Sequence, residues 1–200
     1  RLWRATNIHL LHGRMASGHL QGRLLKMFVT MVRPRNIVEV GTFSGYSALC
    51  MAEGLQEVYG GDLSTGHLYT FEINDEQEDF TRKWIEGSPW ADRVTFVIGD
   101  AAASAPALAK EKDILFDLAF VDGDKRTYID TYEALLPSMA KGGYILADNT
   151  LWDGHVIDEE YQRDPQTRGI RDFNDYVARD SRVSRVILPL RDGLTILRKL

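Results

Sequence analysis

The chain has few cysteines, no long apolar run and no excess of basic residues, and each of these absences excludes a class of protein. Cys50 is the single cysteine in 200 residues, which excludes an intramolecular disulfide framework and is typical of a reducing compartment. No apolar run approaches the roughly 18 residues that cross a membrane, and no signal-peptide pattern follows Arg1. Lys and Arg number 24 against 29 Asp and Glu, and this net charge of −5 does not favour a nucleic-acid partner. We therefore expect a cytoplasmic protein without a membrane partner.

The composition is that of a folded protein. Hydrophobic residues make up 44% and charged residues 26%, which excludes a disordered or collagen-like chain. A chain of 200 residues can bury roughly 70% of its unfolded surface, so it needs no disulfide or structural metal for stability. There are no internal repeats, low-complexity tracts or linker-like stretches. We expect a single domain over residues 1–200.

Short apolar runs alternate with longer helical stretches along most of the chain. The expected strands are 37–41, 67–73, 94–98, 115–121 and 144–147. The expected helices between them are 46–58, 75–85, 101–112 and 127–140. Such alternation is typical of buried parallel strands joined by right-handed crossover helices. The pattern predicts an α/β fold with a doubly wound, mostly parallel sheet.

The two ends of the chain depart from this alternation. Residues 182–190 and 194–200 are strand-like and flank Asp192-Gly193, a strong signal for a β-hairpin. The sheet is therefore expected to end in an antiparallel hairpin. Residues 8–32 have helical spacing interrupted by glycines. They predict one or two helices within an N-terminal segment, 1–32, that lies over the ligand edge of the sheet.

The turn after the first strand is a candidate ligand site, because open α/β sheets bind ligands at the carboxyl ends of their strands. Glu39 lies inside this strand, and Gly41 and Gly45 follow it with three residues between them. This is not the G-x-G-x-x-G of dinucleotide enzymes, since Phe43 stands at the second glycine. The wider spacing suits an adenosine that carries an amino acid, whose carboxylate Ser47 and nearby amides could receive. A plain strand-to-helix turn would use the same glycines.

The next two strand ends also carry polar groups. Glu72 closes the second strand, where an acid commonly accepts hydrogen bonds from ribose hydroxyls. Asp100 and Ala101 close the third strand, where a small residue and a carboxylate could flank an adenine. The alternatives are a solvated carboxylate for Glu72 and a helix N-cap for Asp100.

The fourth and fifth strand ends carry the strongest chemistry. Asp122 follows one strand, and Asp148 and Asn149 end the other. Two carboxylates and an amide oxygen form an all-oxygen ligand set that suits Mg²⁺, Mn²⁺ or Ca²⁺ and not zinc. Each segment alone could be an N-cap or a turn. Together they favour a metal site.

Three further residues near this edge are candidates for chemistry. Lys125 lies beside the expected cation, which would lower the lysine pKa toward that of a general base. The alternative is a surface lysine at the start of a helix. Trp152 could form an aromatic wall for a planar substrate, or belong to the core. His155 could contact substrate, although a loop histidine is the simpler interpretation.

Three motifs together resemble the cation-dependent O-methyltransferases, a family that includes the caffeoyl-coenzyme A and catechol O-methyltransferases and small bacterial relatives. The motifs are EVGTFSGYS at 39–47, DGDK at 122–125 and GGYILADNTLWDG at 142–154. The resemblance extends from Met15 to Leu194. It implies a Rossmann-like, seven-stranded methyltransferase sheet whose last strand is antiparallel. It also implies a homodimer.

The resemblance implies roles for particular residues. It implies that Asp122, Asp148 and Asn149 hold the metal, and that Lys125, with Asp122, is catalytic. The residues implied to bind S-adenosyl-L-methionine are Met15, Glu39, Gly41, Phe43, Ser47, Glu72, Ile73, Asp100, Ala101 and Asp122. Trp152 and His155 are the candidate substrate residues. No basic pocket for coenzyme A phosphates is evident.

The function expected from residues and resemblance is methyl transfer to one hydroxyl of a catechol-like aromatic diol. One alternative keeps the fold and methylates hydroxylated uridine in tRNA, against which the acidic net charge argues. Another is a non-catalytic module that binds S-adenosylmethionine. Such a module would have no need of the four residues Asp122, Lys125, Asp148 and Asn149.

Overall fold

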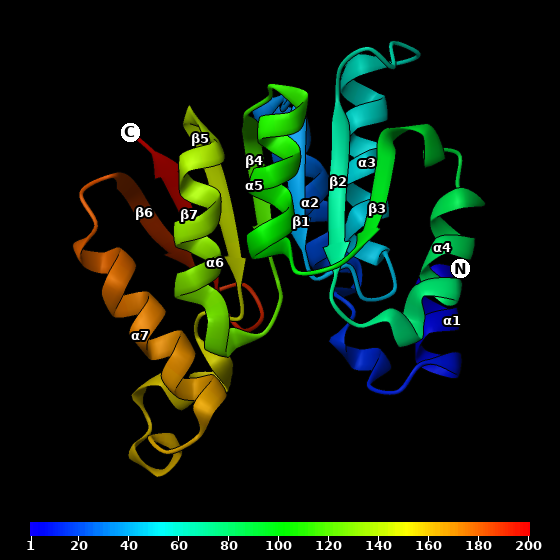
Figure 1. Ribbon diagram of the computed structural model, residues 1–200. Coiled ribbons are helices and arrows are strands. Elements are labelled where there is room, and N and C mark those ends of the chain that lie inside the picture. Colours follow the sequence, from blue (N-terminus) through cyan, green and yellow to red (C-terminus); the bar gives the residue numbers. More distant parts are fainter. The chain divides into compact units, whose positions relative to one another are not determined.

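A computed structural model describes all 200 residues of the chain. The chain divides into two compact units, Arg1–Asp100 and Ala101–Leu200. Each unit has strands flanked by helices (Figure 1). None of the helices combines the length and the apolar character needed to cross a membrane. The expectation of one domain over 1–200 stays a prediction.

The first unit contains three parallel strands in the order β3-β2-β1. Its elements are α1 (Leu2–His9), the 3-10 turn η1 (Gly13–Met15), α2 (Gly18–Val32), β1 (Asn36–Val40), α3 (Tyr46–Tyr59), β2 (His67–Glu72), η2 (Asp75–Gln77), α4 (Glu78–Glu86), η3 (Ala91–Arg93) and β3 (Val94–Ile98). The predicted strands are all present, to within a residue at their ends.

The second unit contains four strands in the order β4-β5-β7-β6. Its elements are α5 (Ala101–Lys112), β4 (Phe116–Val121), η4 (Lys125–Thr127), α6 (Tyr128–Leu135), η5 (Leu136–Ser138), β5 (Met139–Asp148), η6 (Trp152–Ile157), η7 (Glu159–Tyr161), α7 (Pro165–Arg179), β6 (Val183–Leu188) and β7 (Leu194–Lys199). β4 and β5 are parallel, whereas β7 runs antiparallel to both of its neighbours. The predicted C-terminal hairpin is therefore confirmed.

Two predicted boundaries in the second unit were wrong. The helix expected over 127–140 ends at Leu135, because Pro137 follows and cannot continue it. β5 begins at Met139 and not at residue 144. Its first part pairs irregularly with β4, between Phe116 and Leu118, and Gly142 adopts a φ of 82° there. The glycine-rich start of this strand hid it from the sequence pattern.

The N-terminal segment forms two α-helices, and the first begins at Leu2, earlier than expected. The side chain of Leu2 packs with Leu49 of α3 and Ile85 of α4. α2 packs along α3. The segment is thus docked on the first unit, and its closure over a ligand stays a prediction.

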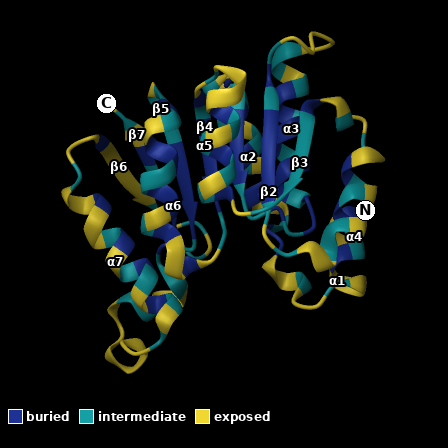
Figure 2. Cartoon of the chain, in the orientation of Figure 1, coloured by how far each residue is buried: buried dark blue, intermediate teal, exposed yellow.

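Burial is greatest in β1, β2, β4, β5 and β7 and on the inner faces of the helices, whereas β3 is partly buried and β6 is largely exposed (Figure 2). In the second unit, α7 is an example of how the sequence determines which face of a helix is buried. Asp164 caps its first turn by accepting the amide N–H of Thr167 at 2.7 Å, and Pro165 occupies the first turn. Ile170, Phe173 and Val177 then recur at helical spacing, and all three are buried. This buried stripe fixes which face of α7 meets the rest of the unit.

Candidate active site

The ends of β4 and β5 bring two of the predicted metal ligands to one edge of the second unit. Val121 and Ala147 are register partners in this parallel pair, so Asp122 and Asp148 follow at neighbouring positions. Asp148 is only 3% exposed. Asn149 comes next with a φ of 60°, the left-handed region in which asparagine is one of the few tolerated residues. The structure therefore confirms that these three residues share one strand edge.

Lys125 is buried beside the same edge. Its ammonium Nζ donates to Asp122 Oδ1 at 2.8 Å and to the hydroxyl of Tyr128 at 2.7 Å. Its side chain is 7% exposed, so the alternative of a surface lysine was wrong. Burial lowers the pKa of Lys125, but Asp122 and Tyr128 outweigh it, and the net pKa is raised. These contacts favour the charged ammonium, opposite to the lowered pKa that the sequence suggested on the assumption of a cation nearby.

Tyr128, in the first turn of α6, is a residue that the sequence analysis missed. It is 1% exposed, and its hydroxyl also lies 3.1 Å from the carbonyl of Val121 and 3.0 Å from that of Asp148. Burial raises its pKa, so the hydroxyl stays protonated. The signal that could have found it is its spacing of three residues from Lys125, which places both side chains on one side of a helical turn.

Helix α7 contacts both polar segments of this edge. Gln166 Oε1 accepts the amide N–H of Lys125 at 3.1 Å, and Asn174 Nδ2 donates to the carbonyl of Thr150 at 2.7 Å. A Cβ at Gly169 would lie 2.8 Å from Arg126 Cα, so the helix backbone closely approaches this segment. α7 therefore buttresses the chain on either side of the candidate site. These residues are remote in sequence, and no local pattern indicated them.

The turn between β6 and β7 packs against the segment that follows Asn149. Leu151 donates its amide N–H to the carbonyl of Asp192 at 2.7 Å, and Thr150 donates to that of Gly193 at 3.1 Å. Trp152 and Asp153 have φ values of 49° and 51°. A positive φ is unfavourable for a residue other than glycine, and such a conformation persists only where contacts with the surrounding structure compensate for it. The hairpin is thus part of the framework that shapes this loop.

The two candidate substrate residues lie in η6, within this loop. Trp152 is half-buried. The imidazole of His155 stacks on the ring of Tyr161, with centroids 3.6 Å apart and planes 7° from parallel. Their contact with a substrate stays a prediction.

The glycine turn of the first unit is built as expected. Gly41, Phe43 and Gly45 have φ values of 93°, 47° and 82°. Glycine adopts such values without cost, whereas Phe43 needs support, and it receives this from two sides. Its amide N–H donates to Glu72 Oε2 at 2.8 Å, and its carbonyl accepts from Thr81 Oγ1 of α4 at 2.5 Å. These two hydrogen bonds therefore hold the turn in one conformation.

Two acidic residues flank this turn. Glu39 is fully buried and accepts from Thr70 Oγ1 at 2.5 Å. Glu72 accepts the amide of Phe43 with one oxygen and that of Asn74 with the other, at 2.9 Å. A carboxylate oxygen has two lone pairs, so Glu72 keeps acceptor capacity toward a ligand. Both acids thus lie where the sequence placed them.

The other residues predicted to bind the cofactor differ in their burial and belong to both units. Ser47 is buried in α3, while Met15 and Ile73 are 61% and 75% exposed. Asp100 ends the first unit and is exposed. Ala101, buried, and Asp122 belong to the second unit. Ser44 was not predicted, yet its hydroxyl is buried without a hydrogen-bond partner. These binding roles stay predictions.

The structure contains no group of three or more Asp, Glu, His or Cys side chains that could hold a metal ion. The predicted metal set has two carboxylates and one amide, so it does not depend on such a group. Metal binding by Asp122, Asp148 and Asn149 stays a prediction.

Comparison with known proteins identifies the relatives of the chain. A sequence model of the O-methyltransferase family matches residues 1–200. Tricin synthase 2 of Oryza sativa subsp. japonica is 34% identical over 197 residues, which cover 94% of this chain and 65% of that protein. Caffeoyl-CoA O-methyltransferase 1 of Eucalyptus globulus is 31% identical, over 90% of this chain and 73% of that protein. The chain thus spans about two thirds to three quarters of the length of these relatives.

A solved structure agrees with the sequence comparisons. The O-methyltransferase of Bacillus cereus in complex with SAH matches 100% of this chain and 89% of its own, with a TM-score of 0.86 and 29% identity. The predicted methyltransferase fold, the resemblance and the predicted class of enzyme are confirmed. The chain belongs to the O-methyltransferase family.

Proposed function

We propose that this protein transfers the methyl group of S-adenosylmethionine to one hydroxyl of a catechol-like aromatic diol, with the help of a divalent cation. The observation that carries the proposal is the arrangement at the ends of β4 and β5. There Asp122 and Asp148 lie at neighbouring positions, and Lys125 is buried against Asp122. Family membership supports the reaction class, and the all-oxygen side-chain set supports the cation.

The first unit suits the methyl donor. S-adenosylmethionine supplies an electrophilic methyl group on a sulfonium. Glu72 would accept hydrogen bonds from the ribose hydroxyls with its remaining lone pairs. The buried hydroxyl of Ser44, which lacks a partner within the chain, and that of Ser47 offer donors to an amino-acid carboxylate. The SAH in the Bacillus cereus relative supports this assignment.

The second unit suits a hard divalent cation. Asp122, Asp148 and Asn149 would hold it through oxygen atoms, as Mg²⁺, Mn²⁺ or Ca²⁺ requires. Lys125 occupies Oδ1 of Asp122, which leaves Oδ2 for another partner. A divalent cation in this place would lower the pKa of a hydroxyl beside it.

The chain's own groups then have defined tasks. The charged ammonium of Lys125 would stabilise the oxyanion that remains when the acceptor hydroxyl loses its proton to solvent. To accept that proton itself, Lys125 would first have to be deprotonated. Trp152 and His155 would contact the aromatic ring. No covalent intermediate with the protein is needed, because the acceptor oxygen attacks the methyl group directly. Positioning and electrostatics would therefore provide most of the rate acceleration.

The test is a radiolabelled methyl-transfer assay over a panel of catechols, with Mg²⁺ and with EDTA. We expect transfer that needs Mg²⁺ and falls by at least about 10²-fold in Asp148→Ala, the scale of lost positioning or electrostatic stabilisation. Asp175→Ala is the control, because Asp175 is an exposed residue of α7. Full activity of Asp148→Ala in EDTA would contradict the proposal that the reaction needs a divalent cation. Total tRNA in place of catechol tests the rival acceptor.

Three broader expectations also stay proposals. We infer one domain, since the family match covers both compact units. A cytoplasmic location and a homodimer are carried over from the sequence analysis. Sedimentation equilibrium of the purified protein would test the dimer.

A further inference from the structure

The hydroxyl of Tyr128 lies where three functional segments meet. It accepts a hydrogen bond from Lys125 Nζ at 2.7 Å. Its own hydrogen faces two backbone carbonyls, Val121 at 3.1 Å and Asp148 at 3.0 Å. Val121 directly precedes Asp122, and Asp148 is itself one of the proposed ligands. One oxygen atom thus contacts the lysine and the backbone of both strand ends.

The hydrogen bonds are chemically consistent. A phenol has one hydrogen and can also accept, so it can receive the ammonium proton while its hydrogen is shared between two carbonyls. The site is fully buried, where such bonds are stronger than in water and an unmade one is costly. The arrangement is therefore specific to a hydroxyl at this position.

The ring that carries the hydroxyl is itself held. Phe173 of α7 packs edge-on against Tyr128, with centroids 5.4 Å apart. A lysine side chain has four flexible carbons and loses much rotamer freedom when it is fixed. Asp122 is the other group that receives a hydrogen bond from Nζ, and it lies in the proposed metal site. Tyr128 is hence the contact that holds Lys125 from outside that ligand set.

We propose that Tyr128 is a positioning residue, which fixes the Lys125 ammonium and ties together the ends of β4 and β5. Its effect on catalysis rests on the proposed function, whereas the positioning itself is a property of the folded chain. Tyr128 would act through Lys125 and the two strand ends. It is assigned no direct contact with the substrate, the methyl donor or the reacting atoms.

The chain offers a matched control on the same helix. Tyr132 is also 1% exposed, lies one turn further along α6, and uses its hydroxyl to bind Asp180 at 2.8 Å. Tyr128→Phe and Tyr132→Phe each remove one buried, hydrogen-bonded hydroxyl and keep the ring. A merely structural role would make the two variants alike.

The first measurement is the rate at which acetic anhydride labels Lys125, followed by peptide mass spectrometry on the folded protein. We expect Tyr128→Phe to raise this rate at least about ten-fold, because the ammonium loses a charge-assisted hydrogen bond. Tyr132→Phe should leave the rate at the wild-type value. Equal labelling of Lys125 in wild type and Tyr128→Phe, or an equal rise in both variants, would overturn the proposal.

The second measurement is methyl transfer to a catechol at saturating donor and acceptor. We expect Tyr128→Phe to lower kcat at least about ten-fold while KM for S-adenosylmethionine changes by less than about two-fold. Tyr132→Phe should keep the wild-type kcat. If labelling responds as expected but even the wild type methylates no catechol, the positioning stands and the proposed function fails. If the wild type is active and both variants match its kcat, the proposed function stands and the effect of Tyr128 on catalysis is overturned.

Discussion

At the scale of single residues, Arg93 of the first unit makes five side-chain hydrogen bonds. It is 1% exposed, and its guanidinium donates to Gln56 Oε1 and to four backbone carbonyls of the loop between α3 and β2, at 2.7–3.1 Å. All five of its N–H groups can therefore be satisfied. We expect Arg93→Met to destabilise the protein by about 3 kcal/mol, because the buried guanidinium and its five hydrogen bonds, four of them to carbonyls of this loop, are lost. Urea denaturation followed by circular dichroism would measure this.

The control for Arg93 is an arginine on the surface. Arg82 of α4 is 41% exposed and pairs with Glu78 and Glu86. Arg82→Met should cost less than about 1 kcal/mol, since exposed ion pairs contribute little. Equal losses of stability in the two variants would show that the loop between α3 and β2 does not depend on Arg93.

The residues that the sequence could predict are those that follow strands. Asp122, Asp148 and Asn149 were identified because a buried apolar run ends just before or at them, and parallel strands end at one edge. Tyr128 could not be distinguished from a core aromatic, because burial of its ring looks the same whether or not its hydroxyl has partners. Gln166 contacts Lys125 across 41 residues of sequence. Such a contact depends on how α7 docks, which no local pattern encodes.

Among the secondary-structure elements, α7 has a close approach that can be tested at Gly169. An added Cβ would lie 2.8 Å from both Arg126 Cα and the carbonyl carbon of Lys125, and backbone atoms cannot give way cheaply. Gly→Ala normally stabilises a helix by about 1 kcal/mol. Here we expect Gly169→Ala to destabilise by about 1–3 kcal/mol through overpacking. Thermal and urea denaturation would establish the sign.

Gly61 provides the comparison for Gly169. It lies in the loop after α3, and no atom comes within 4 Å of a Cβ built there. Gly61→Ala should change the stability by less than about 0.5 kcal/mol, as at an ordinary surface site. A stabilised Gly169→Ala would mean that α7 can move away from Lys125 without cost.

Element types were easier to predict than element ends. The Asp-Gly turn specified the final hairpin, because few residues other than glycine accept the φ of 85° found at Gly193. The start of β5 was missed because its glycines lack the apolar signal of a strand. The end of α6 was missed because the periodicity continues past Leu135, although Pro137 stops the helix.

At the scale of the whole molecule, the net charge is informative through its placement. Each of the first five strands ends at or near an acidic residue, Glu39, Glu72, Asp100, Asp122 or Asp148 in turn. Of these carboxylates, Asp122 forms an ion pair with Lys125. Under the proposed function these carboxylates would serve a sulfonium, a ribose and a cation, which would account for part of the excess of acid.

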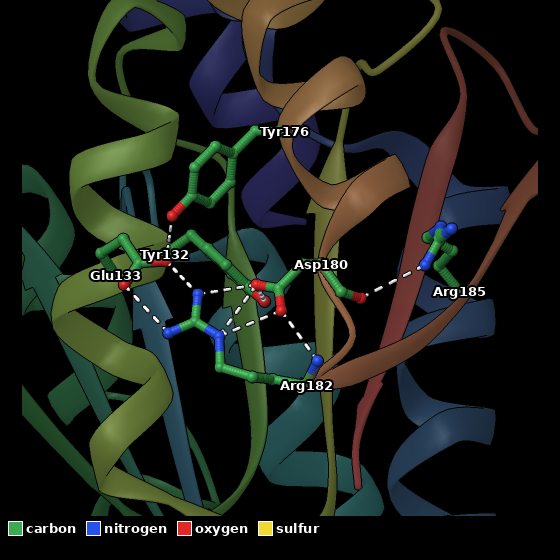
Figure 3. A network of polar contacts seen from close by, with 6 residues as sticks. All are labelled: Tyr132, Glu133, Tyr176, Asp180, Arg182 and Arg185. Atoms are coloured by element: carbon green, nitrogen blue, oxygen red, sulfur yellow. Dashed lines mark hydrogen bonds and ion pairs between the residues drawn. The ribbon is translucent and has the colours of Figure 1, made fainter.

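Other carboxylates serve the stability of the fold. Asp180, at the end of α7, accepts the hydroxyl of Tyr132 at 2.8 Å and the amide N–H of Arg182 at 2.8 Å (Figure 3). The guanidinium of Arg182 binds both Asp180 and Glu133, and Glu133 also accepts from Tyr176. The network joins α6, α7 and the start of β6. It is therefore placed to couple the packing of these elements to pH.

Hydrogen bonds hold the pKa of Asp180 well below its usual range. The largest effect comes from the Arg182 side chain, and smaller ones come from the Arg182 backbone amide and Tyr132. A carboxyl whose folded pKa is lowered contributes stability above its unfolded pKa of about 3.8, and this is lost as the pH falls below that value. We expect Asp180→Asn to destabilise the protein by about 1–2 kcal/mol at pH 7, a modest loss because the Arg182 side chain is 47% exposed. The difference from wild type should begin to shrink as the pH falls below about 4, because the unfolded wild-type chain then takes up a proton at Asp180 that the folded chain still excludes. Urea denaturation at several pH values would show this convergence, with Asp175→Asn, an exposed α7 residue, as the control. A gap between wild type and Asp180→Asn that stays constant down to the acid transition would mean that the network contributes through packing and not through the charge of Asp180.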